Sequence, residues 1–329
     1  MFPPVPPVRP ARRRGLAALL VASAVLVTSA CGSAAPGGES ASGTTAVKVG
    51  VIPIVDVAPV HLGIKQGFFA AEGLDVSLET AQGGAAIVPG VVSGQYQFGF
   101  SNTTSLLLAS SQGLPLKVVT SGVASTGEQG KDFGGVVVKA DSPIKSAADL
   151  AGKRVAVNTL KNINTTTVNQ VVRDAGGDPS TIRYVELAFP DIVAAVARGD
   201  VDAGQVVEPF LTIAAGQADR QVVSNYAATD PGLTVGMYFT SRTYAAQNPK
   251  AVASFTAAMN RSMEYATAHP DEARAILPTY TKIDFAVQKD LVLPKWPATI
   301  DRGPVQRLAD LALRDGLITK QPDLGTLLP

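Results

Sequence analysis

The chain has few of the residues that support covalent cross-links or metal binding. Its 329 residues include one cysteine and two histidines, which excludes an intramolecular disulfide and a site built from paired thiolates. Acidic and basic residues nearly cancel, at 27 and 28. One apolar run lies near the amino terminus, and after it no stretch is long enough to span a membrane. Packing alone must therefore hold the fold.

The single cysteine, Cys31, ends that apolar run. Four arginines precede it, at positions 9 and 12–14, and residues 15–29 carry no charge. The run closes in small residues, so the order basic, apolar, small is that of a secretory signal. It is shorter than the roughly 20 apolar residues of a membrane-spanning helix. A cysteine in this place resembles the lipobox of bacterial lipoproteins, which implies acylation of the Cys31 thiol and cleavage before it.

The sequence after the leader predicts a tether and then folded protein. We expect residues 1–30 to be the signal peptide and residues 31–45 a flexible tether, because residues 32–45 are Gly, Ser, Ala, Thr and Pro with one Glu. Cleavage removes four basic residues and no acidic one, leaving 24 basic and 27 acidic residues, a net charge of −3. This balance predicts no nucleic-acid partner. The remaining residues suffice for two domains.

The folded part alternates between strand and helix patterns. Apolar or alternating runs predict strands at residues 47–52, 74–79, 96–100 and 116–121, with helices at 58–69, 85–92 and 105–110. A second unit repeats the order, with strands at 136–138, 154–157, 182–185 and 203–207 and helices at 146–150, 162–172 and 191–198. Helices at 270–277 and 304–317 are expected to pack back on the first unit. Such an order predicts parallel sheets covered by helices.

The pattern predicts an α/β fold with two lobes. We expect lobe I to hold residues 46–138 and 236–329 and lobe II to hold residues 139–235, with the chain crossing between them twice. The carboxyl ends of parallel strands then face a cleft between the lobes.

Five phrases are more particular than a general α/β sequence. They are IKQGFFAAEGLDV at 64–76, VSGQYQFG at 92–99, DSPIKS and DLAGKRV within 141–155, AVARGDVDA at 195–203 and EPF at 208–210. In this order they resemble the periplasmic-type binding proteins of aliphatic sulfonate, taurine and nitrate ABC importers, a family that also includes thiamine-pyrimidine binding proteins. Gln97 stands where that family usually has an acid. The resemblance implies a two-lobed, periplasmic-binding-protein-like fold of type II with the ligand between the lobes.

Three turns from a strand into a helix are candidate ligand sites, because helix amino termini offer free N–H groups and partial positive charge to an anion. The candidate residues in these turns are Gly83 and Gly84, then Ser101, Asn102 and Thr103, and finally Asn162, Asn164 and Thr165. Each Ser, Thr or Asn here also suits a helix cap, and both interpretations remain open.

Three further residues belong to the candidate site. Asp56 and His61 lie in the segment after the first strand, and His61 is either packed or in contact with ligand. Glu208 follows a strand at the cleft edge, where it could accept hydrogen bonds from a ligand amine or hold the hinge. The only tryptophan, Trp296, either covers the cleft or anchors the core.

No catalytic motif stands out. The chain has no Ser-His-Asp order, Walker loop, paired zinc ligands or dinucleotide-binding glycine pattern. Relatives on this fold that make thiamine pyrimidine use a cysteine-rich segment, which is absent here. We therefore expect no enzyme, no cofactor and no metal site. A pyrimidine-synthesising enzyme and a ligand-sensing surface module are the alternative classes.

The resemblance implies a lipid-anchored solute receptor on the extracytoplasmic face of the cell membrane. Its expected partners are a small-molecule solute, an ABC permease and an ATPase, with the receptor acting as a monomer. Because no arginine falls in the candidate turns, the expected solute is a small organic anion of the sulfonate or taurine kind. Nitrate and a thiamine-pyrimidine precursor are the alternatives.

Overall fold

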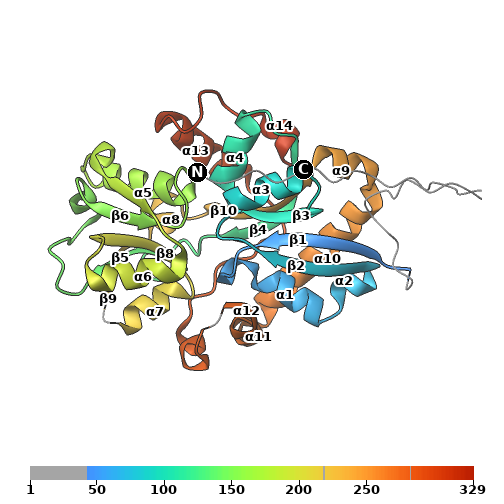
Figure 1. The fold of residues 1–329 in the computed structure, drawn as a ribbon, viewed down its shortest axis with the longest axis horizontal. Helices are drawn as coiled ribbons and strands as arrows, with labels where there is room; N and C mark the ends of the chain where they lie inside the picture. Colours follow the sequence, from blue (N-terminus) through green and yellow to red (C-terminus); the bar gives the residue numbers. More distant parts are fainter. Residues whose placement is uncertain (1–42, 218, 282) are drawn as a thin grey trace, which may run out of the picture. The chain divides into compact units, whose positions relative to one another are not determined.

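The computed structural model describes residues 43–217, 219–281 and 283–329. The predicted signal peptide, the predicted acylation site Cys31 and residues 32–42 lie outside the described residues. The described chain forms two five-stranded sheets with accompanying helices (Figure 1). The predicted α/β architecture is thus confirmed. We call the part that contains the first sheet lobe I and the part that contains the second sheet lobe II.

The sheet of lobe I has the order β2-β1-β3-β10-β4. Its strands are β1 (Thr45–Val51), β2 (Leu74–Thr80), β3 (Phe98–Asn102), β4 (Leu116–Ala124) and β10 (Thr234–Ser241). β1 pairs in parallel with β2 and β3, whereas β10 runs antiparallel to β3 and β4. The predicted parallel pairing holds for β2, β1 and β3. It does not extend to β4, because the chain returning from lobe II inserts the antiparallel β10 between β3 and β4.

The sheet of lobe II repeats this arrangement in the order β7-β6-β8-β5-β9. Its strands are β5 (Gly134–Lys139), β6 (Arg154–Val157), β7 (Arg183–Glu186), β8 (Ala203–Val207) and β9 (Asp219–Val223). The incoming strand β5 runs antiparallel to β8 and β9. The predicted boundary between residues 138 and 139 falls inside β5, so the chain enters lobe II before Gly134. The predicted return at residue 236 falls inside β10, so the chain re-enters lobe I before Thr234.

Helices connect and cover the sheets. In lobe I they are α1 (Ala58–Lys65), α2 (Phe68–Ala71), α3 (Gly84–Val92), α4 (Thr103–Ser111), α9 (Arg242–Gln247), α10 (Pro249–Ala268), α11 (Pro270–Ile276) and α12 (Pro278–Thr281). Lobe II contains α5 (Ile163–Asp174), α6 (Phe189–Arg198), α7 (Phe210–Gly216) and α8 (Asn225–Thr229). The chain ends with α13 (Arg302–Arg314) and α14 (Leu324–Leu327). The described residues also form the short 3₁₀ helices η1 (Val55–Val57), η2 (Ala147–Leu150), η3 (Pro179–Thr181) and η4 (Phe285–Asp290).

Two predicted helices differ from those observed. The helix expected at 58–69 is divided into α1 and α2 by Gly67, whose φ of 72° lies in the left-handed region that favours glycine. The helix expected at 146–150 is the 3₁₀ helix η2. Ser146 and Asp149 form a capping box there, which satisfies the first N–H groups of a very short element.

One buried carboxylate ties the two crossing segments together. Asp132, just before β5, accepts hydrogen bonds from the Ser125 hydroxyl at 2.6 Å and the Thr126 N–H at 3.0 Å in the outgoing segment. Its Oδ2 also accepts the Ala227 N–H of the returning segment at 3.0 Å. The Gln129 amide adds a bond to the Ser224 carbonyl. The outgoing connection is therefore bonded to α8 and to the residue before it, from which the chain returns to lobe I.

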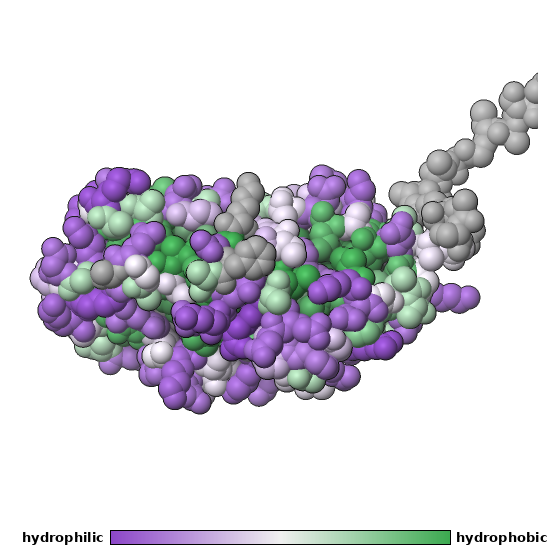
Figure 2. Space-filling model, turned by 90° about the horizontal axis from the view of Figure 1, so that it is seen from below, coloured by the Kyte–Doolittle hydropathy of each residue, from purple (hydrophilic) through white to green (hydrophobic). Residues whose placement is uncertain are grey.

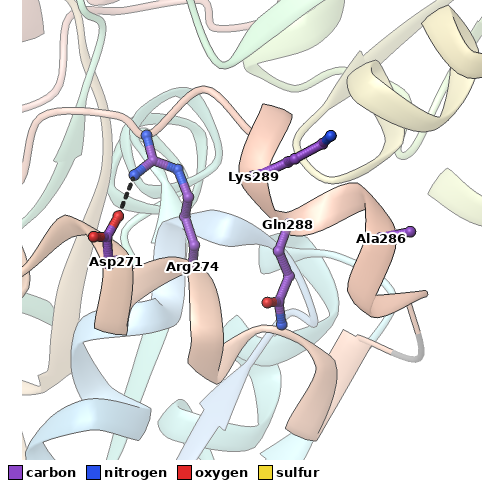
Figure 3. A pocket seen from close by; sticks show the side chains of 5 residues that line it. All are labelled: Asp271, Arg274, Ala286, Gln288 and Lys289. Atoms are coloured by element: carbon purple, nitrogen blue, oxygen red, sulfur yellow. Dashed lines mark hydrogen bonds and ion pairs between the residues drawn. The ribbon is translucent and has the colours of Figure 1, made fainter.

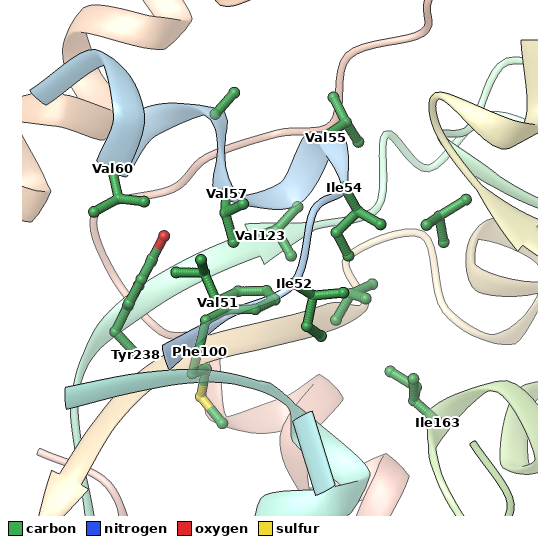
Figure 4. Packing of buried hydrophobic residues seen from close by; sticks show 14 of the residues in the cluster. Val51, Ile52, Ile54, Val55, Val57, Val60, Phe100, Val123, Ile163 and Tyr238 are labelled. Carbon is green, nitrogen blue, oxygen red and sulfur yellow. The ribbon is translucent and has the colours of Figure 1, made fainter. Parts of the chain in front are cut away.

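The apolar core is continuous between the lobes. Val51 and Ile52 at the end of β1 belong to one buried cluster with Phe100 of β3, and the same cluster includes Ile163 and Phe189 of lobe II (Figure 4). A second, smaller cluster lies within lobe II; its members include Val136, Val138, Leu150, Val155, Val168 and Val172. Packing across this shared cluster thus helps to hold the described lobes against each other.

The described surface is predominantly polar. On the face in Figure 2, hydrophilic side chains cover most of the molecule and apolar ones emerge in separate areas between them. Among the described residues, the large hydrophobic side chains that are exposed are Ile64, Leu160 and Leu313. No described helix combines the length and apolar character needed to cross a membrane.

Helix α13, near the carboxyl terminus, contacts both lobes. It packs on α4 of lobe I and on α5 of lobe II, so the expectation that it returns to the first unit is incomplete. At its end, the buried Asp315 accepts from the Arg173 guanidinium at 2.7 Å and from the Asn169 amide at 2.9 Å. Arg307 in its middle donates to the Thr229 carbonyl at 2.9 Å. α13 therefore bridges the lobes.

Candidate ligand-binding site

A small cavity of about 30 Å³ lies between the lobes, where the carboxyl ends of the strands meet. Lobe I contributes Ile52, Ile54, Asp56, Phe100, Asn102 and Val235, and lobe II contributes Asn158, Asn162, Ile163, Asn164, Phe189, Val207 and Tyr226. A single buried water needs roughly 10–15 Å³ measured in this way. A solute of several heavy atoms therefore enters only when the walls move apart.

A larger hollow, of about 410 Å³, lies on the carboxyl-terminal part of the chain. It is lined by Asp271, Arg274, Ala286, Gln288 and Lys289, and Figure 3 shows Arg274 paired with Asp271 across 3.4 Å. None of its lining residues follows a strand of either sheet or belongs to the predicted site. We therefore place the candidate site in the cavity between the lobes.

Three asparagines form a bonded cluster on the lobe II wall. The Asn158 Oδ1 accepts from the Asn162 amide at 3.0 Å and from the Asn164 amide at 2.7 Å. Asn164 in turn accepts the Tyr226 hydroxyl at 2.6 Å. Because these side chains are hydrogen-bonded to one another, this part of the cavity wall has a defined arrangement without a solute. Such preorganisation is what a selective site requires.

The amino terminus of α5 is already capped. The Asn162 Oδ1 accepts the N–H groups of Asn164 at 3.0 Å and Thr165 at 3.4 Å. The N–H of Ile163 donates to the Asn102 Oδ1 of lobe I at 3.3 Å, and the same oxygen caps α4 by accepting the Ser105 N–H at 2.9 Å. One amide oxygen thus serves helices of both lobes. In this closed arrangement the first N–H groups of α5 are bonded within the protein, so the predicted anion donors of this turn are occupied.

Asp56 is the carboxyl group in the cavity wall. Its side chain is 3 % exposed, and its Oδ1 has no hydrogen-bond partner among the described residues. Burial, with a smaller contribution from the negative charge of Asp132, raises the pKa of Asp56 to about 7. Neither lysine nor arginine lines the cavity. The site therefore presents an uncompensated acceptor.

Three hydrogen bonds fix the loop that carries Asp56. The Trp296 indole donates to the Asp56 carbonyl at 3.2 Å, and the Tyr280 hydroxyl donates to the Ile54 carbonyl at 3.1 Å. The Val55 N–H donates to the Glu208 carbonyl at 3.0 Å. Trp296 is buried, so of its two predicted roles it takes the core one and supports this loop from behind.

His61 lies behind the same loop and does not line the cavity. Its ring stacks on Tyr280, with ring centroids 3.7 Å apart. Burial lowers the pKa of His61 to about 4, which keeps the imidazole neutral near pH 7. Of the two interpretations, packing describes His61 in this structure.

In this structure the Glu208 carboxyl bonds within lobe II and to the carboxyl-terminal segment. Its Oε1 accepts from the Thr212 hydroxyl at 2.7 Å and from the Val292 N–H at 3.1 Å, and its Oε2 accepts the Thr212 N–H at 3.0 Å. Burial raises its pKa to about 7. The carboxyl group joins lobe II to the carboxyl-terminal segment and does not line the cavity.

The remaining predicted residues surround the cavity without lining it. A Cβ on Gly83 would lie 2.5 Å from the Thr159 hydroxyl of lobe II, and one on Gly84 would lie 2.8 Å from the Ser101 Cα. The hydroxyls of Thr103 and Thr165 donate to the carbonyls of Thr234 and Asn162. The glycines thus permit close approach between elements, and the threonines satisfy backbone groups.

Of the predicted residues, the cavity brings together Asp56, Asn102, Asn162 and Asn164. Sequence reasoning missed Asn158 and Tyr226. Asn158 directly follows β6, just as Asn102 ends β3. The position of Asn158 at a strand end could therefore have marked it as a candidate site residue. Tyr226 comes from α8, after the edge strand β9, and no local pattern marks it. Among the described residues, no three His, Cys, Asp or Glu side chains gather as metal ligands would.

Sequence comparison identifies relatives that bind small solutes. The chain is 28 % identical over 231 residues to the taurine-binding periplasmic protein of Escherichia coli, covering 69 % of this chain and 68 % of the relative. It is 24 % identical over 261 residues to the formylaminopyrimidine-binding protein of Halalkalibacterium halodurans, covering 78 % and 76 %. Two further relatives carry the name 4-amino-5-hydroxymethyl-2-methylpyrimidine phosphate synthase.

Structural comparison gives the same fold. The alkanesulfonate-binding protein SsuA from Xanthomonas axonopodis pv. citri, bound to MOPS, superposes with a TM-score of 0.73 at 18 % identity, over 86 % of this chain and 98 % of SsuA. The NMT1/THI5-like family model matches residues 54–273, about two thirds of the chain. The resemblance read from the five phrases is confirmed: the chain belongs to the NMT1/THI5-like family and has the two-lobed fold of the periplasmic binding proteins for sulfonates, taurine and nitrate.

Proposed function

We propose that the protein is the solute receptor of an ABC importer and closes its two lobes over one small organic solute. The observation that carries this proposal is the cavity at the strand ends, whose walls come from both lobes. Contacts to both walls favour the closed form only if the solute binds it better than the open form. The solute-binding names of the relatives support the same class of function.

We also propose that the receptor is a monomer held on the extracytoplasmic face of the membrane by the acylated Cys31. The leader order of the sequence and the extracytoplasmic location of the taurine-binding relative support this location. In cells fed labelled palmitate, the wild-type protein should carry the label and a Cys31→Ser variant should not. Absence of label from the wild-type protein would contradict the anchor.

A thermal-shift panel tests the receptor and its solute class. It contains taurine, alkanesulfonates, nitrate and a thiamine-pyrimidine precursor, each added to the purified protein. A solute present at 100 times its dissociation constant should stabilise the folded protein by about 2.7 kcal/mol, which raises the melting temperature by several degrees. If no compound of the panel raises it, the sulfonate, nitrate and pyrimidine assignments all fail.

Closure should depend on the bond between α5 and α13. Replacing Arg173 by methionine leaves the buried Asp315 without its guanidinium partner, at a cost of about 1.5–3 kcal/mol for a hydrogen bond to a charged group. We expect the variant to bind the stabilising solute roughly tenfold more weakly and to scatter X-rays as a more open molecule. The matched control is Arg198→Met, which removes an exposed ion pair within lobe II. An equal loss of affinity in both variants would contradict the bridging role of α13.

A further inference from the structure

The chemistry of the cavity wall narrows the class of solute, an inference that rests on the proposed receptor function. The wall is mainly apolar, from Ile52, Ile54, Phe100, Phe189, Val207 and Val235. Its polar groups are the asparagines, Tyr226 and Asp56. Most of these are already engaged: the asparagines and Tyr226 bond to one another, and Asn102 caps two helices.

Asp56 is the exception. It is 97 % buried, lines the cavity, and leaves one carboxylate oxygen without a partner among the described residues. A buried acceptor without a hydrogen bond costs about 1–3 kcal/mol, and more when it is charged. An orphan group of this kind in a ligand cavity is best explained by a partner that the solute supplies.

The charged groups around the cavity do not favour a simple anion. Asp132 adds a second negative charge within electrostatic reach of Asp56, and its own oxygens are bonded to the crossing segments. No lysine or arginine lines the cavity, and the first N–H groups of α5 are occupied. When Asp56 is ionised, a nitrate or an alkanesulfonate without a donor would leave its Oδ1 unpaired and meet its negative charge.

We propose that the solute carries an amino group, protonated or neutral, that donates a hydrogen bond to the Oδ1 of Asp56. The solute is then an amino-bearing compound, such as a zwitterion or an aminopyrimidine, and not a plain anion. Its remaining part is held by the apolar wall. A bound ammonium would also hold Asp56 in its ionised form, against the effect of burial on that carboxyl.

Matched pairs of compounds test the subsite. One pair is taurine and ethanesulfonate, and the other is an aminopyrimidine and the same pyrimidine without its amino group. Calorimetric titration of the purified protein should give at least one pair in which the amino compound binds about 10–100-fold more tightly, the range expected for a hydrogen bond to a charged group. In Asp56→Asn this ratio should fall to near one, because the acceptor loses its charge and gains a competing N–H₂ donor.

Glu208→Gln is the control, because it neutralises a buried carboxyl that does not line the cavity. It is expected to leave the ratio within each pair unchanged even if the overall affinity falls. Equal binding of both members, or a preference that survives Asp56→Asn, would overturn the amine subsite while the receptor function stands. If no member of either pair binds, the amine subsite and the proposed solute classes fall together.

Discussion

Asp56→Asn should be more stable than the wild-type protein at pH 8, although it removes a group from the site. The pKa of Asp56 is raised from 3.8 to about 7, which corresponds to about 4 kcal/mol of difference between its two protonation states. Below pH 3.8 the carboxyl is protonated in both the folded and the unfolded chain. As the pH rises to 7, the unfolded chain ionises first and gains stability relative to the folded one. The Asp56→Asn variant has no ionisable group at this position, so its folded form does not lose stability in this way.

Urea unfolding of both proteins from pH 4 to pH 8 measures the effect. The difference in unfolding free energy should move by about 4 kcal/mol in favour of the variant across this range and level off above pH 7. The raised pKa of Glu208 acts in the same direction, and the lowered pKa of His61 acts in the opposite one. Both residues occur in both proteins, so their contributions cancel in the difference between the proteins. Asp149→Asn is the control with little pH dependence in this range, because backbone N–H groups lower the pKa of Asp149 below its ordinary 3.8 and its effect on stability changes only at more acidic pH. A difference independent of pH would show that Asp56 is well solvated.

Gly83→Val should hold the lobes apart. The backbone φ of Gly83 is −165°, an extended value that valine adopts without strain. Its Cβ, however, would lie 2.5 Å from the Thr159 hydroxyl and 3.2 Å from the Asn158 amide nitrogen of the other lobe. Overpacking of this kind costs about 1–3 kcal/mol, and here the closed form alone meets that cost. We expect the dissociation constant for the stabilising solute to rise about tenfold to a hundredfold.

Calorimetry and small-angle X-ray scattering distinguish this effect from misfolding. The solute should no longer compact the Gly83→Val variant, while its melting temperature without solute stays near that of the wild type. Gly216→Val is the matched control, because a Cβ there has no neighbour within 4 Å. Full affinity in Gly83→Val would mean that Thr159 and Asn158 simply rotate away.

The strand-end residues were predictable because parallel strands direct their carboxyl ends to one edge of a sheet. That rule led to Asp56, Asn102, Asn162 and Asn164. It could not distinguish a side chain that faces the cavity from one that satisfies its own backbone. Thr103 and Thr165 sit in the same turns, but their hydroxyls bond to carbonyls, a choice set by rotamers that the sequence does not reveal.

The antiparallel strands were not predictable from local pattern. The sequence predicted only that the chain returns to lobe I at β10. Nothing in the sequence of β10 indicates that it enters the sheet between β3 and β4. The polar edge strand β9 lacks the apolar run of a buried strand and was missed. Tyr226 follows β9, so it was missed with it, although its hydroxyl completes the asparagine cluster.

The bonds of Asp132 restrict how the lobes can move. Two separate connections would each bend and twist freely, and the lobes could then meet in many orientations. Because Asp132 of the outgoing connection bonds to α8, from which the chain returns, we expect the two connections to bend together when the lobes move. Each closure then returns Gly83 to Thr159 and Asn102 to Ile163 in the same register. In the proposed closure over a solute, the size of that solute then sets how far these two pairs of residues remain apart.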